Sequence, residues 1–196
     1  MSDGDLPRAT ANRFPTQLID TTRADLFETT SGARLSAAID GLYSAFASAT
    51  LALPLRYCPH CYTKADAGYI EFTPLRQLTT LDAAHILGSV PHTLGTAADL
   101  NYFLPRLLET LAYQGHYLEH VLPERIAVAR SEGWTRDQLG AVLAFMRAYL
   151  CAANAMEYNT SIYYDLSGGM LEELKLVLPE LADELHIQLN DPEAIQ

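Results

Sequence analysis

The sequence is poor in basic residues: 13 Lys and Arg stand against 24 Asp and Glu, which gives a net charge of -11. Proteins that bind nucleic acid draw most of their affinity from Lys and Arg contacts with phosphates, so this balance argues against DNA and RNA as partners. It argues against an anionic membrane surface for the same reason. No run of 18 apolar residues is present, and no transmembrane helix is therefore expected.

Cysteine is also scarce, with three residues, and the first residues lack the basic and apolar regions of a signal peptide. We therefore expect a cytoplasmic protein, whose cysteines are thiols or metal ligands rather than a disulfide framework. The sequence contains no Gly-x-Ser-x-Gly elbow, no His-Glu-x-x-His motif and no Gly-rich phosphate loop. These absences remove the commonest signatures of hydrolases, metallopeptidases and nucleotide-binding enzymes.

Hydrophobic residues recur with helical spacing along most of the chain, whereas strand-like alternation is rare. The clearest stripe comprises Leu35, Ala38, Ile39, Leu42, Tyr43 and Phe46. Further stripes comprise Leu100, Phe103, Leu104, Leu107, Leu108 and Leu111, then Val142, Leu143, Met146 and Leu150, and finally Leu171, Leu174, Leu178, Leu181 and Leu185. The pattern predicts an all-α protein, a single orthogonal bundle of six to seven helices with little or no sheet.

Capping signals indicate where several helices begin. Ser31 is the predicted N-cap of the first helix, and Thr-x-x-Asp boxes at residues 79–82 and 96–99 predict two more. The best local signal is Trp134 followed by a Thr135–Gln138 capping box, directly after Gly133.

Prolines predict the breaks in this pattern. Residues 54–75 contain Pro54, Pro59 and Pro74, so we expect irregular structure there, with a short extended piece at residues 69–72. Pro105 predicts a kink or two abutting helices, and Pro123 predicts an interruption of a helix over residues 116–130.

The length of 196 residues fits one domain. Residues 1–30 are polar and predict a partly ordered N-terminal arm. Residues 31–190 hold the helical patterns and are the predicted domain, and residues 191–196 are the predicted C-terminal tail.

Three segments occur in a familiar order: 56–62 (RYCPHCY), 74–78 (PLRQL) and 99–109 (DLNYFLPRLLE). Together they resemble a family of small uncharacterised bacterial all-helical proteins. The resemblance covers roughly residues 35–150, and its most specific part is the FLPRLLE segment. It implies a shared fold and supplies no catalytic residues.

The Cys-Pro-His-Cys string at residues 58–61 is the main candidate for chemistry, and it allows three interpretations. The first is redox, because Cys-Pro-His-Cys-Tyr is also the active-site string of DsbA-type thiol oxidoreductases. In that fold the first cysteine lies at a helix N-terminus, where the helix dipole lowers its pKa. A thioredoxin-like fold needs a βαβ unit around the motif, whereas the downstream pattern here is helical.

The second interpretation is a structural zinc site. Cys58 and Cys61 supply half of a tetrahedral set, and His116 and His120 supply the other half, since residues four apart project from one helical face. His60, His85 and His92 are substitutes that could complete a different set. The third interpretation is a pair of packed thiols without a ligand, to which Cys151 also belongs.

The function that these observations favour is a non-catalytic helical protein that acts through protein–protein contacts or self-association. It predicts an exposed apolar patch, for example at a dimer interface. The alternative is a zinc-binding or thiol-redox protein centred on Cys58 and Cys61. The favoured function needs no cofactor, and the alternative needs one structural zinc.

Overall fold

The computed structural model of the chain describes residues 30–114, 121–155 and 169–181. Within these ranges the backbone forms seven α-helices and no β-strand, which confirms the predicted all-α bundle. They are α1 (Thr30–Ala45), α2 (Lys64–Phe72), α3 (Thr80–Ser89), α4 (Ala97–Gln114), α5 (Leu122–Ser131), α6 (Arg136–Ala155) and α8 (Gly169–Val177). Two short 3-10 helices, η3 (Leu75–Gln77) and η4 (Pro179–Leu181), follow α2 and α8. Apart from Thr30, the predicted arm and tail lie outside the described residues.

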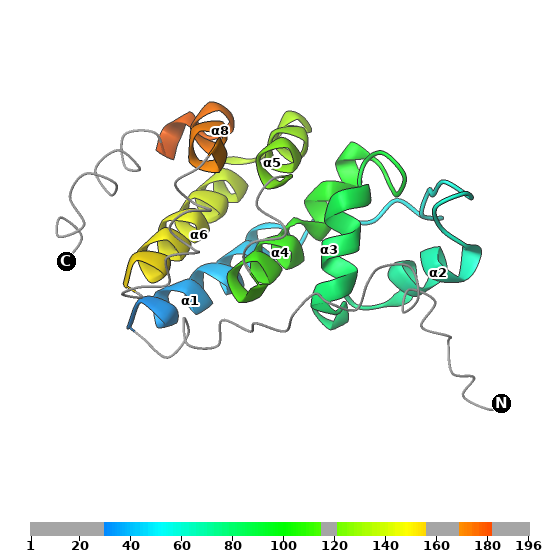
Figure 1. Cartoon of the computed structure of the whole chain (residues 1–196), viewed down its shortest axis with the longest axis horizontal. Helices are drawn as coiled ribbons and strands as arrows, with labels where there is room; N and C mark the ends of the chain where they lie inside the picture. The colour runs from blue at the N-terminus through cyan, green and yellow to red at the C-terminus, as the bar shows by residue number, and fades with distance from the viewer. Residues whose placement is uncertain (1–29, 115–120, 156–168, 182–196) are drawn as a thin grey trace.

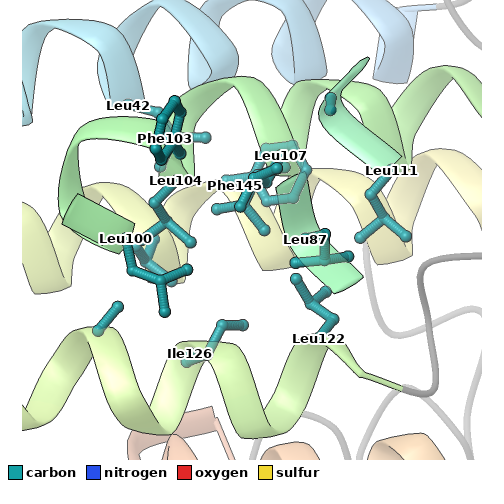
Figure 2. Close-up of a cluster of buried hydrophobic side chains, with 14 of the residues drawn as sticks. Leu42, Leu87, Leu100, Phe103, Leu104, Leu107, Leu111, Leu122, Ile126 and Phe145 are labelled. Atoms are coloured by element: carbon teal, nitrogen blue, oxygen red, sulfur yellow. The ribbon is translucent and has the colours of Figure 1, made fainter. Parts of the chain in front are cut away.

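The hydrophobic core lies where α4 is enclosed by its neighbours. Helix α1 packs along α6, while α4 contacts α1, α3 and α5, and α8 packs on α5 (Figure 1). Figure 2 shows side chains of the neighbouring helices, among them Leu42, Leu87 and Ile126, around the apolar stripe of α4. The predicted stripe residues of α4 are all fully buried: Leu100, Phe103, Leu104, Leu107, Leu108 and Leu111. The helical spacing in the sequence therefore identified the buried face correctly.

Three helices begin with the same Thr-x-x-Asp capping box. In each box the threonine hydroxyl accepts a hydrogen bond from the aspartate N–H, and the aspartate carboxylate accepts from the threonine N–H. The boxes pair Thr63 with Asp66, Thr79 with Asp82, and Thr96 with Asp99. All three carboxylates are buried, so each one closes a helix start against the body of the protein.

The predicted irregular structure is observed over residues 54–63 but was wrong for residues 64–72, as was the extended piece at residues 69–72. Residues Lys64–Phe72 form α2, which the Thr63–Asp66 box opens. Pro59 and Pro74 lie outside the helix on either side, and the helix ends at Thr73 before Pro74. The prolines therefore delimit a short helix rather than prevent one.

Pro105 and Pro123 were both predicted to disturb a helix. Helix α4 continues as one helix through Pro105, which rules out two abutting helices. Pro123 lies in the first turn of α5. Backbone N–H groups in the first turn have no intrahelical acceptor, so a proline there removes no hydrogen bond from the helix. Helix α5 begins at Leu122, and the part of the predicted helix at residues 116–120 lies outside the described ranges, so an interruption at Pro123 stays a prediction. Gly133, at φ 90°, and the Thr135–Gln138 capping box precede α6 as predicted.

None of the described helices is both long and apolar enough to cross a membrane.

Candidate functional site

The 58–61 turn is held on the connection between α3 and α4. The Cys58 N–H donates to the Thr93 carbonyl over 2.8 Å, and the Gly95 N–H donates to the Arg56 carbonyl over 2.7 Å. These bonds flank an isolated antiparallel bridge between Tyr57 and Leu94. The backbone that enters the turn is therefore fixed by residues more than thirty positions away in sequence.

Backbone bonds and one buried tyrosine then close the turn. The N–H groups of Cys61 and Tyr62 both donate to the Cys58 carbonyl, each over 2.9 Å. The Tyr62 ring is buried, and its hydroxyl donates to the Ser89 Oγ over 2.5 Å. Cys58 is half-buried, whereas His60 and Cys61 are exposed. The middle of the turn, at His60 and Cys61, is therefore exposed to solvent, while Cys58 and Tyr62 on either side are held by hydrogen bonds.

The surroundings of Cys58 favour its thiolate. Hydrogen bonds from the His60 and Cys61 backbone N–H groups and from the Cys61 thiol lower the Cys58 pKa below its ordinary value. Residues 56–64 also include Arg56 and Lys64 and no acidic residue. The chain is strongly acidic as a whole, so this turn is a locally basic exception. A thiolate is the form of cysteine that binds metals and attacks electrophiles.

The predicted zinc set is described only in part. His116 and His120 lie in residues 115–120, outside the described ranges, so the four-ligand set with Cys58 and Cys61 stays a prediction. In the part of the chain that the structure describes, no group of three or more His, Cys, Asp or Glu could hold a metal ion.

The substitute histidines have other surroundings. His60 is exposed in the turn itself, and His85 is half-buried in α3, where burial lowers its pKa. The His92 ring lies 3.6 Å from the Glu124 carboxylate and 3.4 Å from the Arg125 guanidinium, at the start of α5.

The structural context around the turn is helical. In the described ranges the turn is followed by α2 and preceded by a loop, and its only extended pairing is the isolated bridge. The βαβ unit that a thioredoxin-like oxidoreductase requires is not formed by these residues. A redox role would therefore rest on the turn alone. Cys151 lies in α6, half-buried, as predicted for a packed thiol.

Two exposed apolar side chains lie near the last turn of α2, the helix that follows the 58–61 turn. Leu53 is 63% exposed and Phe72 is 76% exposed. The Leu55 N–H donates to the Glu71 carboxylate over 3.1 Å, which places the Leu53 segment beside the last turn of α2. We call Leu53, Phe72 and the 58–61 turn together the α2 end. In Figure 1 it lies at the opposite end of the long axis from α6 and α8.

A second group of titratable residues connects α1 to α4. The Tyr43 hydroxyl donates to the Glu109 carboxylate over 2.6 Å, and the Arg106 guanidinium donates to the same oxygen over 2.7 Å. Arg106 also donates to the Leu78 carbonyl, and Arg76 stacks over the Tyr43 ring. Burial, followed by the Glu109 bond, raises the Tyr43 pKa, so its proton is retained.

This second group is best explained as a structural cross-link. Its carboxylate is neutralised by Arg106, and its hydroxyl is fixed as a donor, which leaves no poised acid or base. The pair Arg106 and Glu109 comes from the FLPRLLE segment, and their spacing of three residues was a readable signal for a helix-surface ion pair.

Comparison with protein-family models, curated proteins and solved structures finds no match to the chain. The resemblance to small bacterial helical proteins over roughly residues 35–150 therefore stays a prediction. Functional inference accordingly depends on the geometry and chemistry of the α2 end.

Proposed function

We propose that this chain is a non-catalytic helical protein that acts through self-association, with the α2 end as its contact surface. The observation that carries the proposal is the exposure of Leu53 and Phe72, whose segments are joined by the Leu55–Glu71 hydrogen bond at the last turn of α2. Exposed large apolar side chains that gather in one region are characteristic of interfaces. The segment from position 56 to 64 is also free of acidic residues, so it adds no carboxylate repulsion between two copies of this acidic chain.

The two side chains can contribute substantially to association. Complete burial of a Leu or Phe side chain is worth about 1.5–3 kcal/mol, and most of each of these two side chains is still available. A contribution near 1.4 kcal/mol corresponds to a tenfold change in dissociation constant. Because a twofold dimer contains each residue twice, replacing both should weaken association by at least a hundredfold.

The test compares the mass of the full chain with that of a Leu53→Ser/Phe72→Ser variant over a wide concentration range, by light scattering after gel filtration. Leu176→Ser is the matched control, because Leu176 is 82% exposed on α8, at the other end of the molecule. The expected result is a dimer for the parent chain and the control, and a monomer for the double variant. A parent chain that is monomeric at every concentration would refute self-association.

The second candidate is a zinc-binding or thiol-redox protein in the cytoplasm, and the turn geometry around Cys58 favours it. In its zinc form, Cys58, Cys61, His116 and His120 of one chain hold one structural ion.

Elemental analysis of protein purified without chelator tests this candidate. About one zinc per chain is expected if one chain supplies all four ligands. Loss of that zinc in His116→Ala and in Cys58→Ser would support the complete set. Unchanged zinc content in His116→Ala would exclude it.

A further inference from the structure

We propose that the 58–61 turn is half of a zinc site that a second copy of the chain completes, so that one Zn²⁺ held by four thiolates joins two chains. The proposal rests on the proposed self-association and deepens it, because it names the ligand that holds the two copies together. It differs from the single-chain set in taking both remaining ligands from the partner's Cys58 and Cys61.

The turn has the local geometry that a zinc half-site requires. Two cysteines three residues apart can place both sulfurs on one ion, and four cysteines are a common ligand set of structural zinc sites. The Cys61 and Tyr62 N–H groups both donate to the Cys58 carbonyl over 2.9 Å, which fixes the backbone that carries the two cysteines. The described residues of one chain supply this pair without a third ligand, so the described site is incomplete without another source.

The turn is also accessible to a second molecule. His60 and Cys61 are exposed at its tip, while Cys58 and Tyr62 anchor its base to Thr93 and Ser89. The turn lies at one end of the molecule, away from the packing of α1 against α6 (Figure 1). Two copies can therefore approach tip to tip about a twofold axis without displacing any helix.

Charge supports a metal-bridged contact at this position. Each chain carries a net charge of -11, so two copies repel one another over most of their surfaces. Four thiolates and one Zn²⁺ together carry two negative charges, and Arg56 and Lys64 of both chains offset them locally. The ion therefore brings together two acidic molecules at the segment where neither contributes a carboxylate.

The exposed apolar residues fit within the same contact. Lys64 and Phe72, the first and last residues of α2, are roughly 12 Å apart along the helix axis. A standard interface covers about 800 Å² on each partner, equivalent to a patch about 30 Å across. An interface centred on the zinc can thus extend to Phe72 and Leu53. The zinc ion would fix how the two chains are placed relative to one another, and the apolar side chains would contribute buried surface area.

The experiment uses the full chain, stripped of metal with a chelator under reducing conditions and then titrated with Zn²⁺. Mass is followed by light scattering, and bound metal is followed by elemental analysis. Co²⁺ is titrated in parallel, because its absorption spectrum reports the number of thiolate ligands. The expected result is a monomer that becomes a dimer as it binds half a zinc ion per chain, with a four-thiolate cobalt spectrum.

Variants locate the ligands. Cys58→Ser and Cys61→Ser should each abolish zinc-dependent dimerisation, whereas Cys151→Ser should dimerise as the parent does. A His116→Ala/His120→Ala variant should retain the dimer and the half-stoichiometric zinc. Circular dichroism of each cysteine variant verifies folding, because the turn lies outside the core helices and its loss should leave helix content unchanged.

Other outcomes overturn the bridge and separate it from the proposed function. One zinc per chain on a monomer, lost in the histidine variant, assigns the site to a single chain and refutes the bridge. A dimer that persists in chelator and in Cys58→Ser, but not in Leu53→Ser/Phe72→Ser, refutes the zinc bridge while self-association stands. A chain that stays monomeric and binds no zinc refutes both.

Discussion

Replacement of Asp99 by alanine should be the most destabilising change to a charged residue at a helix start. The Asp99 carboxylate is 1% exposed and accepts three hydrogen bonds. Two come from the N–H and hydroxyl of Thr96, both at 2.7 Å, and one comes from the Ala52 N–H at 2.8 Å. The first two cap α4, and the third attaches the loop before Leu53 to the same helix start. Asp99→Ala removes the carboxylate half of the capping box and the attachment together, and leaves the bond from the residue-99 N–H to the Thr96 hydroxyl.

The size of the effect follows from these contacts. A hydrogen bond to a charged group contributes about 1.5–3 kcal/mol, and a capping residue alone about 1 kcal/mol. The Ala52 and Thr96 N–H groups are partly accessible to water, which reduces the total, so we expect a loss of about 2–4 kcal/mol. With a urea m-value of about 2 kcal/mol/M, the midpoint should fall by roughly 1–2 M.

Urea unfolding followed by circular dichroism measures this loss, with Asp137→Ala as the control. Asp137 is an exposed aspartate in the first turn of α6, and Gln138 supplies that capping box instead. Its removal should therefore cost only the helix-dipole contribution, about 0.3–1 kcal/mol. Similar midpoints for the two variants would show that the buried contacts of Asp99 contribute nothing beyond its charge, and the reasoning would fail.

Three further changes test separate features. Gly95→Ala should lower the unfolding free energy by about 1–3 kcal/mol in the same urea assay, because Gly95 has φ 61° and an added Cβ would lie 3.1 Å from a carboxylate oxygen; unchanged stability would contradict this. Glu180→Gln removes a pair in which the Arg130 guanidinium hydrogen-bonds to Glu180 and lowers the Glu180 pKa, and it keeps the Arg130 bond to the Val177 carbonyl. That pair stabilises the fold at neutral pH by up to about 1 kcal/mol, and the contribution disappears as acid protonates Glu180. The variant should thus lose stability at pH 7 and match the parent in acid, and a constant difference across pH would be inconsistent with the pair. The alkylation rate of Cys58 should rise with pH around a midpoint below about 8.5, which is the pKa of an ordinary thiol, because the surroundings of Cys58 lower its pKa. Peptide mapping after iodoacetamide treatment measures the rate at each pH. A midpoint at or above that value would exclude a stabilised thiolate.

The helical stripes could be predicted because each one is local. Leu35, Ile39, Leu42 and Phe46 recur within a single helix, and all four are buried as expected. Helix α2 was missed although its Thr63–Asp66 box has the same spacing as the two boxes that were used. Three nearby prolines outweighed that signal, yet all of them lie beyond the ends of the helix. A short helix with few buried residues leaves little periodicity to set against such breakers.

The surroundings of the candidate site could not be predicted from local pattern. The string at residues 58–61 was visible, but its attachment to Thr93 and Gly95 pairs segments more than thirty residues apart. The same holds for the contact between Tyr43 and Glu109, whose separation is 66 residues. Such contacts depend on how α1, α3 and α4 pack, and one sequence carries no signal for that packing.

The anchoring of the 58–61 turn has an energetic consequence for whatever binds there. Fixing the backbone of one residue requires about 1–2 kcal/mol of conformational entropy, so ordering the five residues from Cys58 to Tyr62 would oppose capture of a ligand by roughly 5–10 kcal/mol. Here Thr93, Gly95 and Ser89 already impose that order when the chain folds. Under the proposed functions, a metal ion or a partner would meet a turn whose backbone is already ordered, so little of the interaction energy would be spent on ordering it.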